Sequence, residues 1–180
     1  MEVLFRQSGF QRTPTVVTRA DHVRLSVPVF GKVAPLPHDL SHYVIERELE
    51  LPDGFWGSVA DGAIFEGMHI LAGRQRPHAR ERSRAVMKAH HHQILFSEIL
   101  VESVLRALRG ERLGPEPLPI NSPNVPSRTL ADRDALLRRL VPPMEDMVAR
   151  WQTLALGDSL RLLWPERARV RPAPGVNRTG

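Results

Sequence analysis

The sequence contains no cysteine, and this absence alone excludes several kinds of site. Disulfides, thiolate zinc sites, iron–sulfur clusters and cysteine nucleophiles all need the thiol group. Lysine is almost as rare, because Lys32 and Lys88 are the only two in 180 residues. The net charge of +5 is therefore carried almost entirely by arginine.

Long apolar runs are also missing, since no segment of the sequence approaches the ~20 residues that span a bilayer. The first residues, 1–7, lack the basic region and the apolar core of a secretory signal. We therefore expect a cytoplasmic protein without a membrane segment. A glycine-rich nucleotide loop, a Walker lysine, an EF-hand loop and the Gly-x-Ser-x-Gly elbow of serine hydrolases are absent as well.

The length of 180 residues is sufficient for one domain with a sizeable core. Apolar residues make up 42% of the chain and charged residues 25%, which is typical of globular proteins. We expect a single domain over residues 1–165. Five prolines predict a loop excursion from this domain at 111–128, and the arginine- and proline-rich segment 166–180 predicts a disordered tail.

Strands are predicted at both ends of this domain. Residues 2–7 and 15–19 are β-prone, and apolar and polar residues alternate over 22–30. Alternation bounded by turn residues indicates an antiparallel meander with one solvated face. Residues 159–164 predict a closing strand that returns to this N-terminal sheet.

Helices are predicted between the meander and the closing strand, at 37–51, near 53–60, at 78–109, at 129–140 and at 144–154. The helix at 78–109 is the longest, because its apolar residues fall on one stripe. Val141-Pro-Pro143 predicts a break between the last two helices. The fold class is therefore α+β: a small antiparallel sheet of about four strands, with helices packed on one face.

One helix carries a chemically specific pattern. His38, His42 and Glu46 lie four residues apart, and at ~100° per residue their side chains spread over only about 80° of the helix surface. Two imidazoles and a carboxylate on one face are typical ligands of a divalent metal, with zinc the most favoured. Glu46 would be a third ligand or would orient a histidine, and Asp39 would position a metal-bound water as the catalytic carboxylate.

A further ligand would come from a second helix, as in metal sites of helical bundles. His90 and Glu98 are the candidates, since both belong to the helix predicted at 78–109. The alternative interpretation makes these two residues part of the core margin, and makes Asp39 a favourable charge at a helix N-terminus.

The segment from His38 to Glu46, His-Asp-Leu-Ser-His-Tyr-Val-Ile-Glu, resembles part of a family of uncharacterised bacterial proteins. Members of that family begin with a small sheet, carry an LPHDL-x-H helix and close with a strand ending in Trp-Pro, here Trp164-Pro165. The resemblance covers most of residues 1–165 and implies this fold. It implies no activity, because none is established for the family.

The same nine residues are also similar, more loosely, to the H-E-x-x-H helix of zinc metallopeptidases. In those enzymes two helix histidines bind zinc, and the residue after the first is a glutamate that acts as general base. Asp39 occupies that position here and is one methylene shorter. The shorter reach to a metal-bound water argues against proteolysis.

Two alternative functions are therefore predicted. The first is a metal-binding, metal-dependent hydrolase-like protein that uses the H-D-x-x-H-x-x-x-E helix. The second is a non-catalytic binding or regulatory module whose arginine-rich surface binds an acidic partner or nucleic acid. The arginines concerned gather in two segments, Arg74, Arg76, Arg80, Arg82 and Arg84, and Arg167, Arg169, Arg171 and Arg178.

Overall fold

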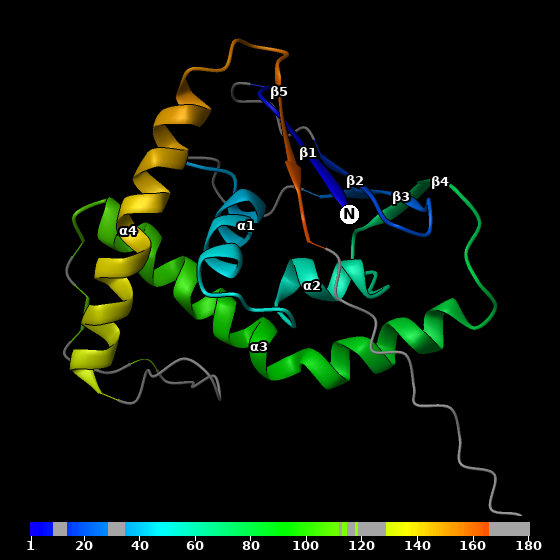
Figure 1. Ribbon diagram of the computed structural model, residues 1–180, viewed down its shortest axis with the longest axis horizontal. Helices are drawn as coiled ribbons and strands as arrows, with labels where there is room; N and C mark the ends of the chain where they lie inside the picture. Colours follow the sequence, from blue (N-terminus) through cyan, green and yellow to red (C-terminus); the bar gives the residue numbers. More distant parts are fainter. Residues whose placement is uncertain (9–13, 29–34, 112, 115–117, 119–128, 166–180) are drawn as a thin grey trace, which may run out of the picture.

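The computed structural model describes residues 1–8, 14–28, 35–111, 113–114, 118 and 129–165. Within them the strands are β1 (Glu2–Arg6), β2 (Thr15–Thr18), β3 (Arg24–Val27), β4 (His69–Ala72) and β5 (Ser159–Leu163). The helices are α1 (His38–Glu48), α2 (Phe55–Ala60), α3 (Ala79–Leu108) and α4 (Leu130–Gln152) (Figure 1).

The five strands form one sheet in the order β4-β3-β2-β1-β5, and every neighbouring pair is antiparallel. The last strand lies beside the first, where Leu162 pairs with Val3. This pairing continues beyond β5, because Trp164 N donates to Met1 O at 2.8 Å. The predicted α+β class, with an N-terminal meander and a returning closing strand, is therefore confirmed.

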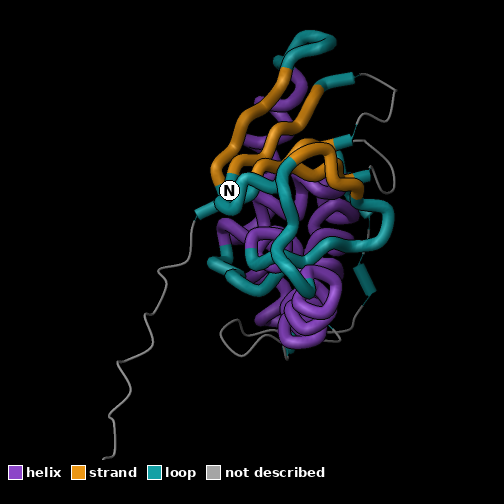
Figure 2. Tube along the Cα trace, turned by 90° about the vertical axis from the view of Figure 1, so that its right-hand side faces the viewer, coloured by secondary structure: helices purple, strands orange, loops and turns teal. Residues whose placement is uncertain are grey.

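One face of the sheet is buried under the helices (Figure 2). Alternate residues of the strands point into this core, among them Val3, Phe5, Val17, Leu25 and Leu160. Their neighbours along the strands are less buried, as expected for a half-buried antiparallel sheet.

Helix α1 is the central helix of the fold and contacts α2, α3 and α4. Residues 39–46 are all buried, whichever side of the helix they occupy. Pro37 precedes the helix and suits its start, because its fixed φ is already helical and its missing N–H leaves no unsatisfied donor. Apolar residues on both sides of this helix account for its position between other elements.

The predicted break at Val141-Pro-Pro143 is wrong, since α4 continues through Pro142 and Pro143 without interruption. A proline inside a helix removes one backbone hydrogen bond. Leu140 and Met144 flank the two prolines, lie one turn apart and are fully buried. Packing of this apolar face against the core outweighs the lost hydrogen bonds.

Strand β4 was not predicted. All four of its residues are exposed, so the apolar–polar alternation of a half-buried strand is absent. It forms because its backbone pairs with β3 at the edge of the sheet, with an irregularity between Arg24 and Leu25. The sheet therefore has five strands rather than about four.

The remaining expectations concern the loop excursion, the tail, a membrane segment and the cellular location. The proline-rich excursion at 111–128 lies largely, and the tail at 166–180 wholly, outside the described residues. Each helix of the described part is too short or too polar to cross a bilayer. The cytoplasmic location stays a prediction.

Candidate metal centre

The structure brings His38, His42 and Glu98 together where α1 crosses α3. One ligand atom from each residue lies within 4.8 Å of the other two. The Glu98 carboxylate lies between the imidazoles, with Oε1 3.2 Å from His42 Nε2 and Oε2 3.5 Å from His38 Nε2. The two imidazole rings are one helical turn apart, with centroids separated by 4.8 Å.

The three side chains differ in their access to solvent. His42 is only 2% exposed, whereas the side chains of His38 and Glu98 are 27% and 45% exposed. The group is thus closed on the His42 side and open to solvent on the other. An ion at this position would be bound by His42 on its buried side and would remain accessible to water on the side of His38 and Glu98.

Glu46 lies outside this group and faces the other nitrogen of the buried imidazole. Its Oε1 is 3.2 Å from His42 Nδ1. Its two oxygens also accept hydrogen bonds from Phe55 N at 2.7 Å and Trp56 N at 2.9 Å, at the start of α2. Of the two roles predicted for Glu46, this geometry suits the orientation of a histidine.

Ser97 fixes the same nitrogen of His42 from α3. The Ser97 hydroxyl donates to Ile94 O at 3.1 Å, and its oxygen lies 3.2 Å from His42 Nδ1. Both neighbours of Nδ1, the serine oxygen and the Glu46 carboxylate, therefore accept a hydrogen bond from it. This arrangement keeps the proton on Nδ1 and turns Nε2 toward His38 and Glu98.

The Nε2 atom of His42 is buried and has no hydrogen-bond partner among the described residues. Glu98 Oε1 lies 3.2 Å from it and forms an ion pair with His42 when the imidazole is protonated. Burial alone lowers the pKa of His42, yet the Glu46 and Glu98 carboxylates outweigh it and raise that pKa to about 9. Without a metal, His42 is therefore an imidazolium at neutral pH.

The pKa values of its two neighbours shift downward. Burial lowers the pKa of His38, and the charge on His42 lowers it further. Burial alone raises the pKa of Glu98, but the two histidines overcome that effect and lower it. At neutral pH Glu98 is therefore ionised, and His38 is a neutral imidazole with a free lone pair.

A glycine makes the approach of Glu46 to α2 possible. A Cβ atom on Gly54 would lie 2.3 Å from Glu46 Cδ, much closer than side-chain carbons approach each other. Gly57, one turn further on, is packed in the same way against the Pro52 carbonyl. These two glycines therefore serve the close packing of elements, which is the more common use of glycine in an irregular segment.

Asp39 follows His38 in the sequence, but its carboxylate is bonded to other groups. It is buried, it accepts hydrogen bonds from the Thr15 hydroxyl and from Leu40 N, and burial raises its pKa. Its backbone carbonyl accepts from Trp56 Nε1 at 2.8 Å. These contacts connect α1 to strand β2 and to α2.

His90 lies in a second group of potential ligands, with Asp53 and Asp61. Its Nε2 is 3.3 Å from Asp53 Oδ1 and 3.9 Å from Asp61 Oδ2. Of the two candidates on α3, only Glu98 therefore joins the α1 histidines. No sequence pattern indicated the two aspartates, since they flank a short glycine-containing helix without periodic spacing.

His90 also contacts a serine, so that a serine, a histidine and an aspartate lie in contact one after another. Ser58 Oγ is 3.0 Å from His90 Nδ1 and 2.7 Å from Gly54 O. Ser58 is fully buried within α2. Its hydroxyl is therefore a packing link between α2 and α3, and it is closed to a substrate.

No family model, curated protein or solved structure matches this chain. The resemblances of the LPHDL-x-H helix to bacterial proteins and to zinc metallopeptidases accordingly stay predictions.

We predict that Gly54→Ala lowers the free energy of unfolding by about 1–3 kcal/mol, because the new methyl group displaces the Glu46 carboxylate. Chemical denaturation measures this change. Gly114→Ala is the matched control, since a Cβ there meets no atom within 4 Å. Equal effects of the two substitutions would contradict the packing role of Gly54.

The raised pKa of His42 predicts a pH-dependent stability of the metal-free protein. The imidazolium contributes stability that is complete below about pH 6.5, the ordinary histidine pKa, and that is lost as pH rises toward about 9. Urea denaturation with a chelator present should show this decline, and His42→Gln should flatten it. An NMR titration that gives His42 a pKa near 6.5 would refute the prediction.

Proposed function

We propose that the protein binds one divalent metal ion, zinc being the expected one, through His38, His42 and Glu98. The observation that carries this proposal is the buried Nε2 of His42, which has no hydrogen-bond partner among the described residues while Nδ1 is fixed on the other side of the ring. Metal-bound histidines commonly donate their second ring N–H to a carboxylate, and Glu46 is placed to accept it. Glu46 is thus the residue that orients the ligand.

The ligand set supports a catalytic rather than a purely structural centre. Two histidines and one carboxylate occur in catalytic zinc sites, whereas structural sites use four protein ligands. An ion with three protein ligands keeps a position for water and lowers the pKa of that water, which is the basis of metal-assisted hydrolysis. The exposure of His38 and Glu98 leaves that position open to a substrate. We therefore propose a metal-dependent hydrolase-like activity.

Asp39 has a different role in this proposal from the one that its position in the sequence suggests. Its carboxylate binds the Thr15 hydroxyl, so we assign it to the contact between α1 and β2. Glu98, from α3, is the exposed carboxylate of the cluster and would hold the ion together with the two histidines. The ion would supply the activation of a water there.

If the cluster has a purely structural role, a different final state of His42 is expected. In that case the His42 imidazolium is the final state, held between Glu46 and Glu98 as a partly buried ion cluster. In the proposed function a metal ion replaces the proton on Nε2, because a histidine ligand must be deprotonated there. Metal binding by the untagged protein distinguishes the two roles.

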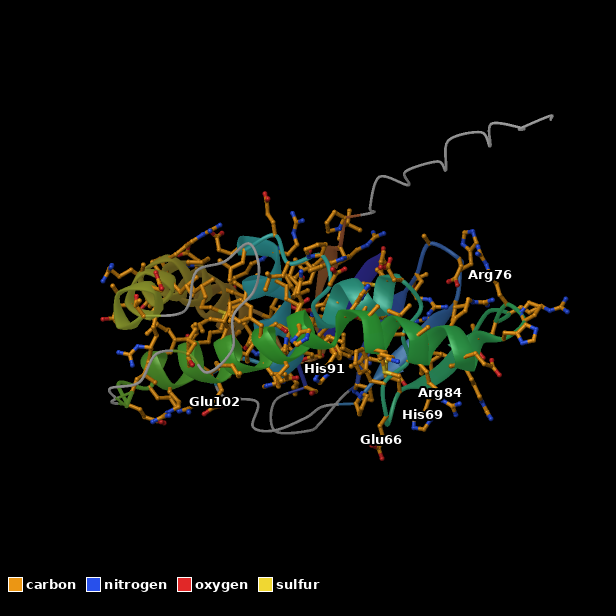
Figure 3. All side chains as sticks on the ribbon, turned by 90° about the horizontal axis from the view of Figure 1, so that it is seen from below. Glu66, His69, Arg76, Arg84, His91 and Glu102 are labelled. Carbon is orange, nitrogen blue, oxygen red and sulfur yellow. The ribbon has the colours of Figure 1, made fainter. Side chains whose placement is uncertain are left out.

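We predict that untagged, chelator-treated protein takes up one equivalent of zinc, measured by competition with a chromophoric chelator and by elemental analysis. His38→Ala and Glu98→Gln should each weaken binding at least about tenfold, and Glu46→Gln by about 10–100-fold, because it orients a ligand. His91→Ala and Glu81→Gln are matched controls on α3, since both side chains are exposed (His91 is labelled in Figure 3). Stoichiometry near zero, or equal losses in the controls, would contradict the metal centre.

Hydrolysis has its own test, so that it can fail while the metal centre stands. We expect zinc-loaded protein to cleave an activated carboxylic ester or phosphodiester, with a rate at least about tenfold lower after chelation or in the Glu98→Gln variant. His91→Ala should keep the full rate. Stoichiometric zinc without any zinc-dependent cleavage would reject the hydrolase-like activity and retain the metal-binding function.

A further inference from the structure

A second site lies at the start of α3, where a pocket of about 260 Å³ opens between the β2–β3 turn, the end of α2 and the first turn of α3. Charged residues dominate its walls. Those that matter for its chemistry are Arg19, Asp21, Asp61, Arg76, Ala79 and Arg82. The pocket thus brings Arg19 together with two arginines from a distant segment of the sequence.

Arg19 is the innermost of these arginines, and its side chain is only 6% exposed. Its Nε and Nη2 donate to the two carboxylate oxygens of Asp21, at 3.1 and 2.8 Å. Its Nη1 is buried and has no hydrogen-bond partner among the described residues. A buried guanidinium N–H without an acceptor is costly, so an acceptor is expected there.

The free Nη1 is directed at the wall of the pocket. A Cβ on Gly62 would lie 3.8 Å from this nitrogen, and Gly62 itself lines the pocket. The side-chain hydrogen of glycine leaves the approach to Nη1 open. Because Nη1 is shielded from solvent, an anion in the pocket is attracted by the charge of this guanidinium and gains the hydrogen bond to Nη1 when the wall at Gly62 shifts.

Two exposed arginines complete the positive lining. Neither Arg76 nor Arg82 has a side-chain hydrogen bond or ion pair within the described parts of the chain. Burial alone raises the pKa of Asp21, but Arg19 chiefly, and Arg76 in addition, lower that pKa. The charge of Arg76 therefore acts at the carboxylate that Arg19 binds. Arg76 lies at the end of the molecule where α3 begins (Figure 3). With three arginines against two aspartates, the pocket favours an anion.

The start of α3 adds a further attraction for negative charge. The residue that precedes the helix, His78, makes no side-chain capping bond, and Ala79 at the first helical position lines the pocket. The first backbone N–H groups of a helix lack intrahelical acceptors, and its dipole is positive at this end. An anion in the pocket would meet this end of a 30-residue helix.

We propose that this pocket binds the phosphate group of a small phosphate monoester. Donors converge on it from the β2–β3 turn, from the loop before α3 and from α3 itself, which suits a tetrahedral group with several acceptor oxygens better than a planar carboxylate. Arginine forks bind phosphate through paired charge-assisted hydrogen bonds. The volume of the pocket admits a phosphate with a small organic group and excludes a duplex or a folded partner.

This site divides the arginine cluster that the sequence analysis grouped as one surface. Arg80 and Arg84 line a different pocket, together with His69 and Ile70. Arg84 and His69 lie on the same side of the molecule (Figure 3). The site is also separate from the metal centre, because sixteen residues of α3 separate Arg82 from Glu98, or about 24 Å.

The test titrates inorganic phosphate and glycerol phosphate into the chelator-treated full chain at low ionic strength, followed by calorimetry and NMR. We expect saturable binding of both, which Arg76→Gln and Arg82→Gln each weaken at least about fivefold. Arg84→Gln is the matched control and should leave binding unchanged, because this arginine lies outside the pocket. Both test positions are exposed, so the substitutions spare the core.

Further titrations decide the chemistry and the independence of the site. Acetate and succinate should bind more weakly than phosphate, and His38→Ala should bind phosphate as the unmodified chain does. No saturable phosphate binding, equal losses in all three arginine variants, or tighter carboxylate binding would overturn the proposal. Salt-sensitive binding of a single-stranded oligonucleotide that Arg84→Gln weakens as much as Arg82→Gln would replace it with a diffuse nucleic-acid surface.

Discussion

The carboxylate of Glu46 fixes both the start of α2 and the orientation of the His42 imidazole. It is buried at the centre of the fold, and it binds two backbone N–H groups of α2 and one nitrogen of His42. Because the same two oxygens satisfy both groups, the position of α2 and the orientation of the imidazole are linked. The glycine that faces Glu46 is part of this arrangement, since any side chain there would occupy the space of the carboxylate. Removing one member of this network leaves another buried polar group without a partner.

Two buried nitrogens, Nε2 of His42 and Nη1 of Arg19, have no hydrogen-bond partner among the described residues. The candidate metal centre around His42 is lined by the carboxylates of Glu46 and Glu98. The pocket beside Arg19 is lined by three arginines and two aspartates. One site therefore suits a cation and the other an anion. Both border α3, which supplies Glu98 to the first site and Ala79 and Arg82 to the second.

Local patterns predicted those features that depend on local periodicity. The strands of the meander follow from alternation, and the positions of His38 and His42 on one helical face follow from their spacing. What depended on packing was harder to predict. Asp39 is turned away by Thr15, a residue of β2, and His90 is drawn to aspartates at either end of α2. Strand β4 lacks a buried face, and the prolines of α4 are overridden by the core. No sequence pattern indicated a role for Arg19, because the residues around it come from three segments that are distant in the sequence.

The pairing of β1 with β5 has a consequence for synthesis of the chain on the ribosome. Until β5 emerges, the side of β1 that it covers is an open edge with unpaired backbone groups. Such an edge invites pairing with another nascent chain, and closing it requires contact between residues about 160 positions apart. The sheet is therefore completed only after β5 has left the ribosome, and until then the edge of β1 is exposed to aggregation and to chaperones.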